Sequence, residues 1–200
     1  QNYWSRCKDP EDPSRGLMYV GLISWLVHDI TLQKMDKYGL TPYYNPVTMP
    51  SGRAYEAAFM KAVEENRTIF GLYWTPSSVA GTGYWKVLSE PQDIFFSPQS
   101  DSRAEVSPAG TSPVFPFQTS DVHILISPGL KDRAPELIPF FTAMKPGEDA
   151  LSAILAKGYQ QNEHNWNRLG IQYLRANEER WQTWVSPDAH RRISDALNQT

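Results

Sequence analysis

Two tryptophans of this 200-residue chain stand where a strand-like stretch ends, a position that suits them for binding a cation. Trp25 follows the apolar run 17–23, and Trp74 closes the apolar run 68–74 directly before Thr75. An indole offers the strongest aromatic face for a cation, and a desolvated contact with a quaternary ammonium group contributes about 2 kcal/mol. A tryptophan also fills a core well, so the residues around each indole decide between packing and binding.

The start of a predicted helix beside Trp25 supplies the second half of a possible site. Ser24 is the predicted cap, Leu26 is expected to face the core, and Gly39 ends the helix in the left-handed position after its last turn. The amides of Leu26 and Val27 would then be free at the helix N-terminus, where the partial positive charge favours an anion. A cation face beside anion-binding amides predicts a site for a zwitterion.

Alternating apolar runs and helical patterns predict βαβ units with a mixed or parallel sheet. Ser51 opens a second predicted helix that ends before Asn66. The run 68–74 is continuously apolar, as expected for a strand covered on both faces, and residues 122–126 predict a further strand. Residues 97–118 are rich in Ser, Pro and Gly and predict a long surface loop.

The remainder of the chain predicts helices. Ser186 and Pro187 have the residue types of a cap and a first helical position, and they start the last helix. A preceding helix carries one predicted buried face with helical spacing, made by Trp166, Leu169, Gly170, Tyr173 and Leu174.

Composition and motifs argue against several other functions. A net charge of −3 gives no sign of nucleic-acid binding, which usually shows as a basic domain. The histidines lack zinc spacing, Cys7 is the only cysteine, and neither a nucleophile elbow nor a phosphate-binding glycine loop occurs. We therefore expect no enzymatic activity, no cofactor and no metal site.

The order and spacing of several segments resemble those of a known family. Over nearly its whole length the chain is similar to glycine betaine and proline betaine (choline) substrate-binding proteins of ABC transporters, and the most specific element is Trp-Thr-Pro at the end of a strand. The segments that carry the resemblance are 25–40, 72–76, 120–126, 134–136, 177–181 and 184–185.

This resemblance implies an α/β fold of the type II periplasmic-binding-protein class, with a mixed sheet flanked by helices and two lobes that close on the ligand. Residues 1–120 would form the ligand-binding second lobe of the family. Residues 121–200 would form the C-terminal, mainly helical part of a first lobe that is incomplete in this chain. The implied ligand-binding residues are Trp25, Leu26, Val27, Trp74 and Thr75, with the indoles around the ammonium group and the amides on the carboxylate.

The resemblance also implies partners and a location. They are a quaternary ammonium ligand, an ABC permease, and a second chain or further copies that complete the first lobe, all outside the cell or in the periplasm. Two departures from the family leave a second hypothesis open. Leu26 replaces a glycine, and Ser77 and Ser78 stand where relatives often have an aromatic residue. The alternative is a secreted, non-catalytic interaction or oligomerising protein that reuses the binding-protein scaffold.

Overall fold

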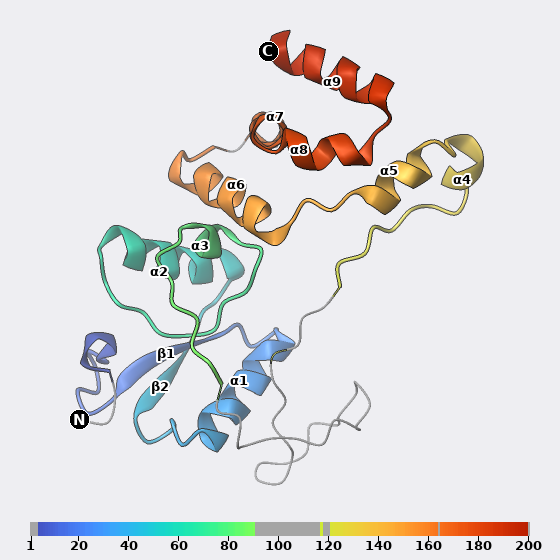
Figure 1. Ribbon diagram of the computed structural model, residues 1–200. Coiled ribbons are helices and arrows are strands. Elements are labelled where there is room, and N and C mark those ends of the chain that lie inside the picture. The colour runs from blue at the N-terminus through green and yellow to red at the C-terminus, as the bar shows by residue number, and fades with distance from the viewer. Residues whose placement is uncertain (1–3, 91–116, 118–120, 164, 200) are drawn as a thin grey trace. The chain divides into compact units, whose positions relative to one another are not determined.

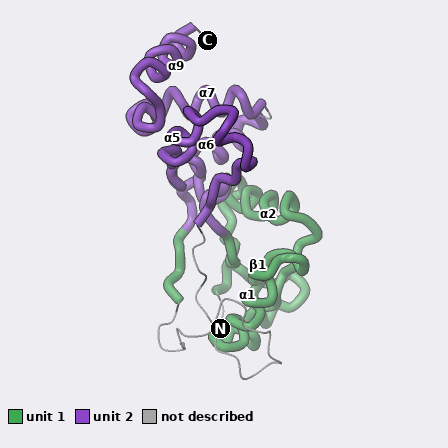
Figure 2. The backbone as a smooth tube through the Cα atoms, turned by 90° about the vertical axis from the view of Figure 1, so that its right-hand side faces the viewer, with its two compact units in different colours: residues 1–73, 86–119 green, residues 74–85, 120–200 purple. Residues whose placement is uncertain are grey.

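The computed structural model describes residues 4–90, 117, 121–163 and 165–199 (Figure 1). The chain divides into two compact units (Figure 2). The first unit contains residues 1–73 and 86–119, and the second contains residues 74–85 and 120–200. Nearly all of the predicted loop 97–118 lies outside the described residues. The assignment of residues 1–120 and 121–200 to the two lobes of the family stays a prediction.

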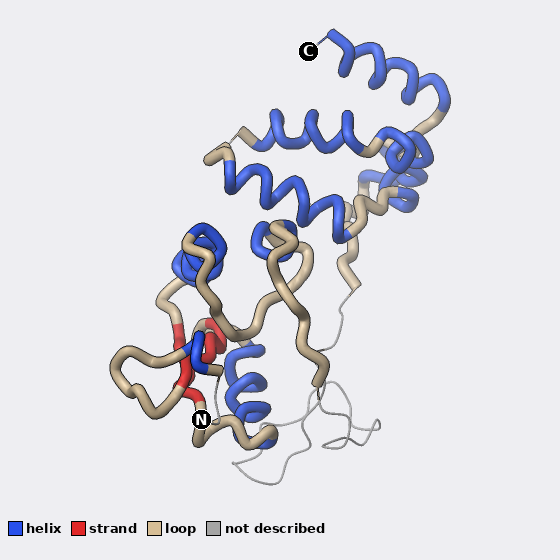
Figure 3. The backbone as a smooth tube through the Cα atoms, turned by 60° about the vertical axis from the view of Figure 1, so that its left-hand side comes forward, coloured by secondary structure: helices blue, strands red, loops and turns tan. Residues whose placement is uncertain are grey.

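The first unit is built on a βαβ arrangement, visible in Figure 3 as two short strands with helices beside them. The two strands are parallel, and Gly16 of the first lies opposite Tyr44 of the second. A helix joins them, as parallel pairing requires. The elements of this unit are η1 (Ser5–Cys7), β1 (Gly16–Gly21), α1 (Leu26–Lys37), β2 (Tyr44–Thr48) and α2 (Gly52–Glu64).

The predicted strand 68–74 is wrong as a continuous strand. The segment meets β1 through one parallel bridge, in which the Tyr19 amide donates to the Phe70 carbonyl at 2.9 Å and the Leu72 amide donates to the Tyr19 carbonyl at 2.9 Å. At Gly71 the two backbones come so close that a Cβ atom would lie 2.4 Å from the Tyr19 carbonyl oxygen. Glycine permits this approach but offers no side chain to pack on the sheet.

Helices cover both faces of β1, as the sequence predicted for this part of the chain. Neighbouring residues of a strand point to opposite faces. Val20 and Met35 belong to one buried apolar cluster, so this face of β1 packs against α1. Tyr19 points the other way, and its ring contacts the rings of Tyr55 and Phe59 on α2 with centroid separations of 6.4 and 5.6 Å.

The ends of α1 agree only partly with the prediction. Gly39 follows the helix at φ +65°, and the Leu40 amide donates to the Met35 carbonyl at 2.8 Å, which confirms the predicted stop. The N-cap is Trp25 rather than Ser24. The inward position predicted for Leu26 is also wrong, because its side chain is 73% exposed. The first buried residue of α1 is His28, two positions after Leu26. Two positions correspond to a turn of about 200° around the helix axis, so Leu26 points away from the buried side.

The predicted cap of α2 is confirmed, since the Ser51 side chain accepts a hydrogen bond from the Ala54 amide at 3.1 Å. We expect Ser51→Ala to lower the free energy of unfolding by about 1 kcal/mol, because the helix loses an N-cap acceptor. Ser51→Asp keeps an acceptor and is the matched control, with a change of only a few tenths of a kcal/mol. Urea denaturation of the three proteins measures both values. Equal stability of all three would show that the cap contributes nothing.

Residues 86–119 belong to the first unit, and an ion pair with the buried Lys34 holds Glu90 there. The ammonium of Lys34 on α1 pairs with the Glu90 carboxylate and lies 3.5 Å from the centroid of the Phe117 ring. Burial lowers the pKa of Lys34, and Glu90 partly opposes that shift. Removing one partner of such a pair leaves the other charge in a poorly solvated place.

The regular elements of the second unit are all helices within its described residues, and loops join them (Figure 3). Its core contains Tyr173, Trp181 and Trp184. Leu169 is buried as predicted for the face of α7, but Trp166 is 68% exposed, so that part of the predicted face is wrong. Its elements are α3 (Ser78–Gly81), α4 (Leu130–Arg133), α5 (Leu137–Ala143), α6 (Glu148–Gln160), α7 (Trp166–Ala176), α8 (Glu178–Trp181), η2 (Gln182–Trp184) and α9 (Pro187–Gln199).

The short helix α3 lies directly on α6. A Cβ atom at Gly81 would stand 1.9 Å from the Ser152 carbonyl oxygen, so only glycine permits this approach. The Ser77 amide donates to the Ser152 hydroxyl at 3.1 Å, and both residues are buried. These contacts fix the segment that starts at Trp74 to the first two turns of α6.

The predicted strand 122–126 is not formed. Val122 is 93% exposed and Leu125 is 92% exposed, and the segment has no strand partner in the part of the chain that the structure describes. A strand needs a neighbour for its backbone hydrogen bonds. The apolar sequence alone therefore does not produce a strand.

Candidate functional site

The indole of Trp25 rests on the aromatic side of the first unit. Trp25 has an extended backbone, with φ −93° and ψ 132°, and its carbonyl accepts the His28 amide at 3.0 Å as α1 begins. Its ring meets the Tyr55 ring at 5.6 Å with an interplanar angle of 67°. An edge-to-face contact of this kind is a favoured aromatic geometry. Trp25 is half-buried, and its ring is supported by Tyr55 of α2.

Tyr55 is the anchor of this arrangement and is fully buried. Its hydroxyl donates to the Leu72 carbonyl at 2.6 Å, with the Tyr19 carbonyl 3.2 Å away. Burial raises the pKa of Tyr55 far above its usual value, so the hydroxyl remains a neutral donor. Its ring also stacks on that of Tyr73, at 5.7 Å and 24°. Tyr55 of α2 therefore contacts both the segment before Trp74 and the indole of Trp25.

The amides of Leu26 and Val27 occupy the first two positions of α1. In a helix these N–H groups have no intrahelical acceptor and carry part of the positive end of the dipole. Among the described residues no side chain caps this end. The carboxylate of Asp29, the first acidic residue of α1, accepts a hydrogen bond from Nδ1 of His28 at 2.9 Å. The two amides therefore remain available for an external acceptor.

Trp74 lies in the second unit, at the start of the segment that packs on α6. Its side chain is 45% exposed. Its carbonyl accepts the Ser77 hydroxyl at 2.7 Å, and the neighbouring Thr75 hydroxyl donates to Oε2 of Glu148 at 3.0 Å. Thr75 is exposed, so the candidate residues of this segment can be reached from solvent.

Ser77 and Ser78 have structural roles in this segment. Ser77 caps α3 by accepting the Ala80 amide at 3.1 Å, and both Ser77 and Ser78 are buried. Small buried side chains at this point allow the segment to lie on α6.

Comparison with protein families establishes which family the chain belongs to. Residues 5–165 match the family described as the substrate-binding domain of ABC-type glycine betaine transport systems. The chain belongs to this family. No curated protein was found to match the chain.

Membership in this substrate-binding family agrees with the expected class of α/β fold and supports a non-catalytic role. The match includes the whole of α1 and α2, and it includes Trp25 and Trp74 with their surroundings. Helices α7, α8 and α9 follow it along the chain. The roles of individual residues are taken up below as a proposal.

A cluster on α8 and α9, beyond the family match, superficially resembles a hydrolytic triad. Glu178 accepts Ser194 at 3.0 Å and also lies 3.0 Å from Nε2 of His190. In a triad the acid and the nucleophile contact different nitrogens of the histidine. Here Ser194 lies 3.5 Å from the same Nε2, so no proton relay is formed. The cluster instead joins α9 to α8.

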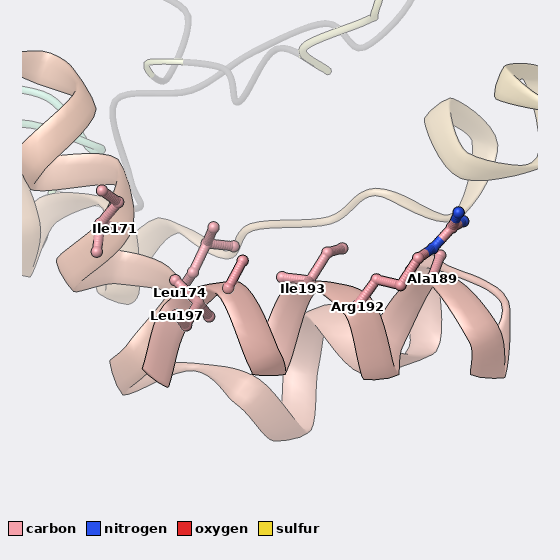
Figure 4. Close-up of a pocket in the computed structure, with 7 residues that line it drawn as sticks. Ile171, Leu174, Ala189, Arg192, Ile193 and Leu197 are labelled. Carbon is pink, nitrogen blue, oxygen red and sulfur yellow. The ribbon is translucent and has the colours of Figure 1, made fainter. Parts of the chain in front are cut away.

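A groove of about 380 Å³ runs between α7 and α9 (Figure 4). Its walls are aliphatic, and one guanidinium, that of Arg192, is paired with Asp188 at 3.4 Å. The groove has neither an aromatic face nor a free helix N-terminus, so it differs from the site expected for this family. Its lining residues are Ile171, Leu174, Ala189, Arg192, Ile193, Ala196 and Leu197.

Two further searches cover only the described residues of the chain. Among them, no group of three or more His, Cys, Asp or Glu residues is arranged to hold a metal ion. No helix in those ranges has the length and apolar character needed to cross a membrane.

Sequence reasoning missed Tyr55 as the support of Trp25. Tyr55 lies in a predicted helix, and its position in the sequence resembles that of an ordinary core residue. The signal was its helical spacing from Phe59, which places both rings on one face of α2. The contact partner, however, is separated from it by 30 residues and cannot be read from local pattern.

Proposed function

We propose that this chain binds glycine betaine, choline or a related quaternary ammonium compound as the ligand-binding part of an ABC uptake system, outside the cell or in the periplasm. One observation carries the proposal. The Trp25 indole, held by Tyr55, is followed directly by two helix N-terminal amides without a cap. A cation face and an anion-binding helix end thus come from three successive residues of one unit. Family membership supports the transport role.

The proposed binding mode assigns a role to each candidate residue. Trp25 and Trp74 are each proposed as an indole face for an ammonium group, and the amides of Leu26 and Val27 as donors to the ligand carboxylate. Thr75 positions the segment around Trp74 and faces the ligand with its exposed side. Desolvated cation–π contacts and charge-assisted hydrogen bonds together make such a site selective for a zwitterion. An ABC permease is the proposed protein partner.

Calorimetric titration tests this function. We expect heat of binding with glycine betaine and choline, and none with an uncharged isostere that replaces the ammonium nitrogen by carbon. Trp25→Ala should weaken glycine betaine binding about tenfold, because one cation–π wall contributes about 1–2 kcal/mol. Trp166→Ala removes an exposed tryptophan of the second unit and is the control. Folded protein that gives no heat with either ammonium compound would refute the proposal.

The exposed segment 122–126 favours a second candidate function, an interaction or oligomerising protein built on the same scaffold. An exposed apolar segment that pairs with no strand among the described residues is a template for a strand from another chain or another copy. Light scattering should then give a mass well above the chain mass of 22.8 kDa. Leu125→Lys should shift the mass toward that value. A monomer at all concentrations would remove the support for this candidate.

A further inference from the structure

Two hydrogen bonds tie the segment that begins at Trp74 to the start of α6. The Thr75 hydroxyl donates to Oε2 of Glu148, the first residue of α6, at 3.0 Å. One helical turn further, the buried Ser152 hydroxyl accepts the Ser77 amide at 3.1 Å. The second contact is buried and the first is exposed. The geometry therefore keeps a carboxylate beside the residue that follows Trp74.

Glu148 is well suited to interact with a ligand because it is accessible and, among the described residues, pairs with no cationic side chain. Its side chain is exposed, and within the described residues no Lys, Arg or His forms a salt bridge with it. The guanidinium of Arg180 lies against the preceding Gly147 without pairing with Glu148. A carboxylate that accepts a hydrogen bond from a hydroxyl and is not neutralised by a cation within the described residues retains most of its capacity to attract a cation.

We infer that Glu148 is a specificity-determining residue of the ligand site, and that it favours net positive ligands such as choline over zwitterions such as glycine betaine. This inference rests on the proposed function. The carboxylate attracts the ammonium group that lies against Trp74, but it repels a carboxylate on the same ligand. For choline only the attraction remains. The ratio of the two affinities therefore depends on the charge at position 148.

The primary experiment compares the two ligands on wild-type protein and Glu148→Gln by calorimetry. We expect the variant to bind choline about threefold to fivefold more weakly, since exposed charge pairs contribute modestly. Its affinity for glycine betaine should be unchanged or higher. Glu179→Gln makes the same charge change at an exposed position on α8 and should leave both affinities unchanged. Equal losses for both ligands in Glu148→Gln would overturn the inference.

A second measurement keeps this inference separate from the proposed function. The indole N–H signal of Trp74, assigned with Trp74→Phe, is followed by NMR while tetramethylammonium chloride is added. We expect the signal to shift in wild-type protein, to shift less in Glu148→Gln, and to give an intermediate shift in Thr75→Val, which loses the hydrogen bond that positions the carboxylate. Sodium chloride is the salt control. A signal that does not move, or that moves equally in all three proteins, overturns the role of Glu148 even where calorimetry detects glycine betaine.

Discussion

Replacing Trp181 by alanine is expected to lower the free energy of unfolding of the second unit by about 3–5 kcal/mol. Trp181 is 1% exposed, the largest fully buried side chain among the described residues. Its ring lies in one cluster with Tyr173 and Trp184, and its indole N–H donates to the Leu174 carbonyl at 2.7 Å. The substitution removes the packing, leaves a cavity and deprives a buried carbonyl of its donor.

Urea denaturation followed by circular dichroism measures the loss, and amide hydrogen exchange assigns it to the second unit through the amides of α7. Trp166→Ala is the matched control, because the same ring is removed from an exposed position of the same unit and the change should stay within about 0.5 kcal/mol. Similar losses in the two variants would show that Trp181 is not the centre of this core.

Helix ends were the part of the fold that the sequence predicted best. Ser51 caps α2 and Gly39 follows α1, because a cap depends on atoms within three or four residues of one another. Ser186 likewise accepts the Ala189 amide at 3.3 Å at the start of α9. Ser24 is the exception. The N-cap is Trp25 instead, and its ring contacts Tyr55, a residue distant in the sequence.

Strands were predicted less well, because a strand is defined by its partner. The run 68–74 has a strand-like composition but meets β1 at a single bridge around Gly71. The segment 122–126 pairs with no strand within the described residues. Local pattern reports β-propensity, whereas pairing depends on which chain segments come together. That information is absent from a single sequence.

The candidate site shows the same division between local and distant information. The free amides of Leu26 and Val27 follow from the start of α1, and this helix start could be read from the sequence within two residues. The residues that support the site could not be predicted from the sequence. Tyr55 reaches Trp25 from a different helix, and Glu148 reaches Thr75 across 73 residues. Residues that position a site through tertiary contacts leave no spacing signal.

Replacing Tyr55 by alanine is expected to destabilise the first unit by about 3–5 kcal/mol and also to weaken glycine betaine binding. The stability loss follows from removing a fully buried aromatic ring. The binding loss has a separate cause. Without the ring at 5.6 Å, the Trp25 indole loses its support and can turn away from the helix N-terminus. We expect the dissociation constant to rise about tenfold, as for the loss of one cation–π wall.

Tyr55→Phe separates these two effects, because it keeps the ring and removes only the hydroxyl that donates to Leu72. Its stability should fall by about 1–3 kcal/mol, the cost of leaving a buried carbonyl without its donor. Its affinity for glycine betaine should stay at the wild-type value. Both variants are titrated at a temperature where circular dichroism shows them fully folded, with Tyr84→Ala as the exposed tyrosine control. If Tyr55→Phe lost as much affinity as Tyr55→Ala, the position of Leu72 rather than the support of Trp25 would control binding.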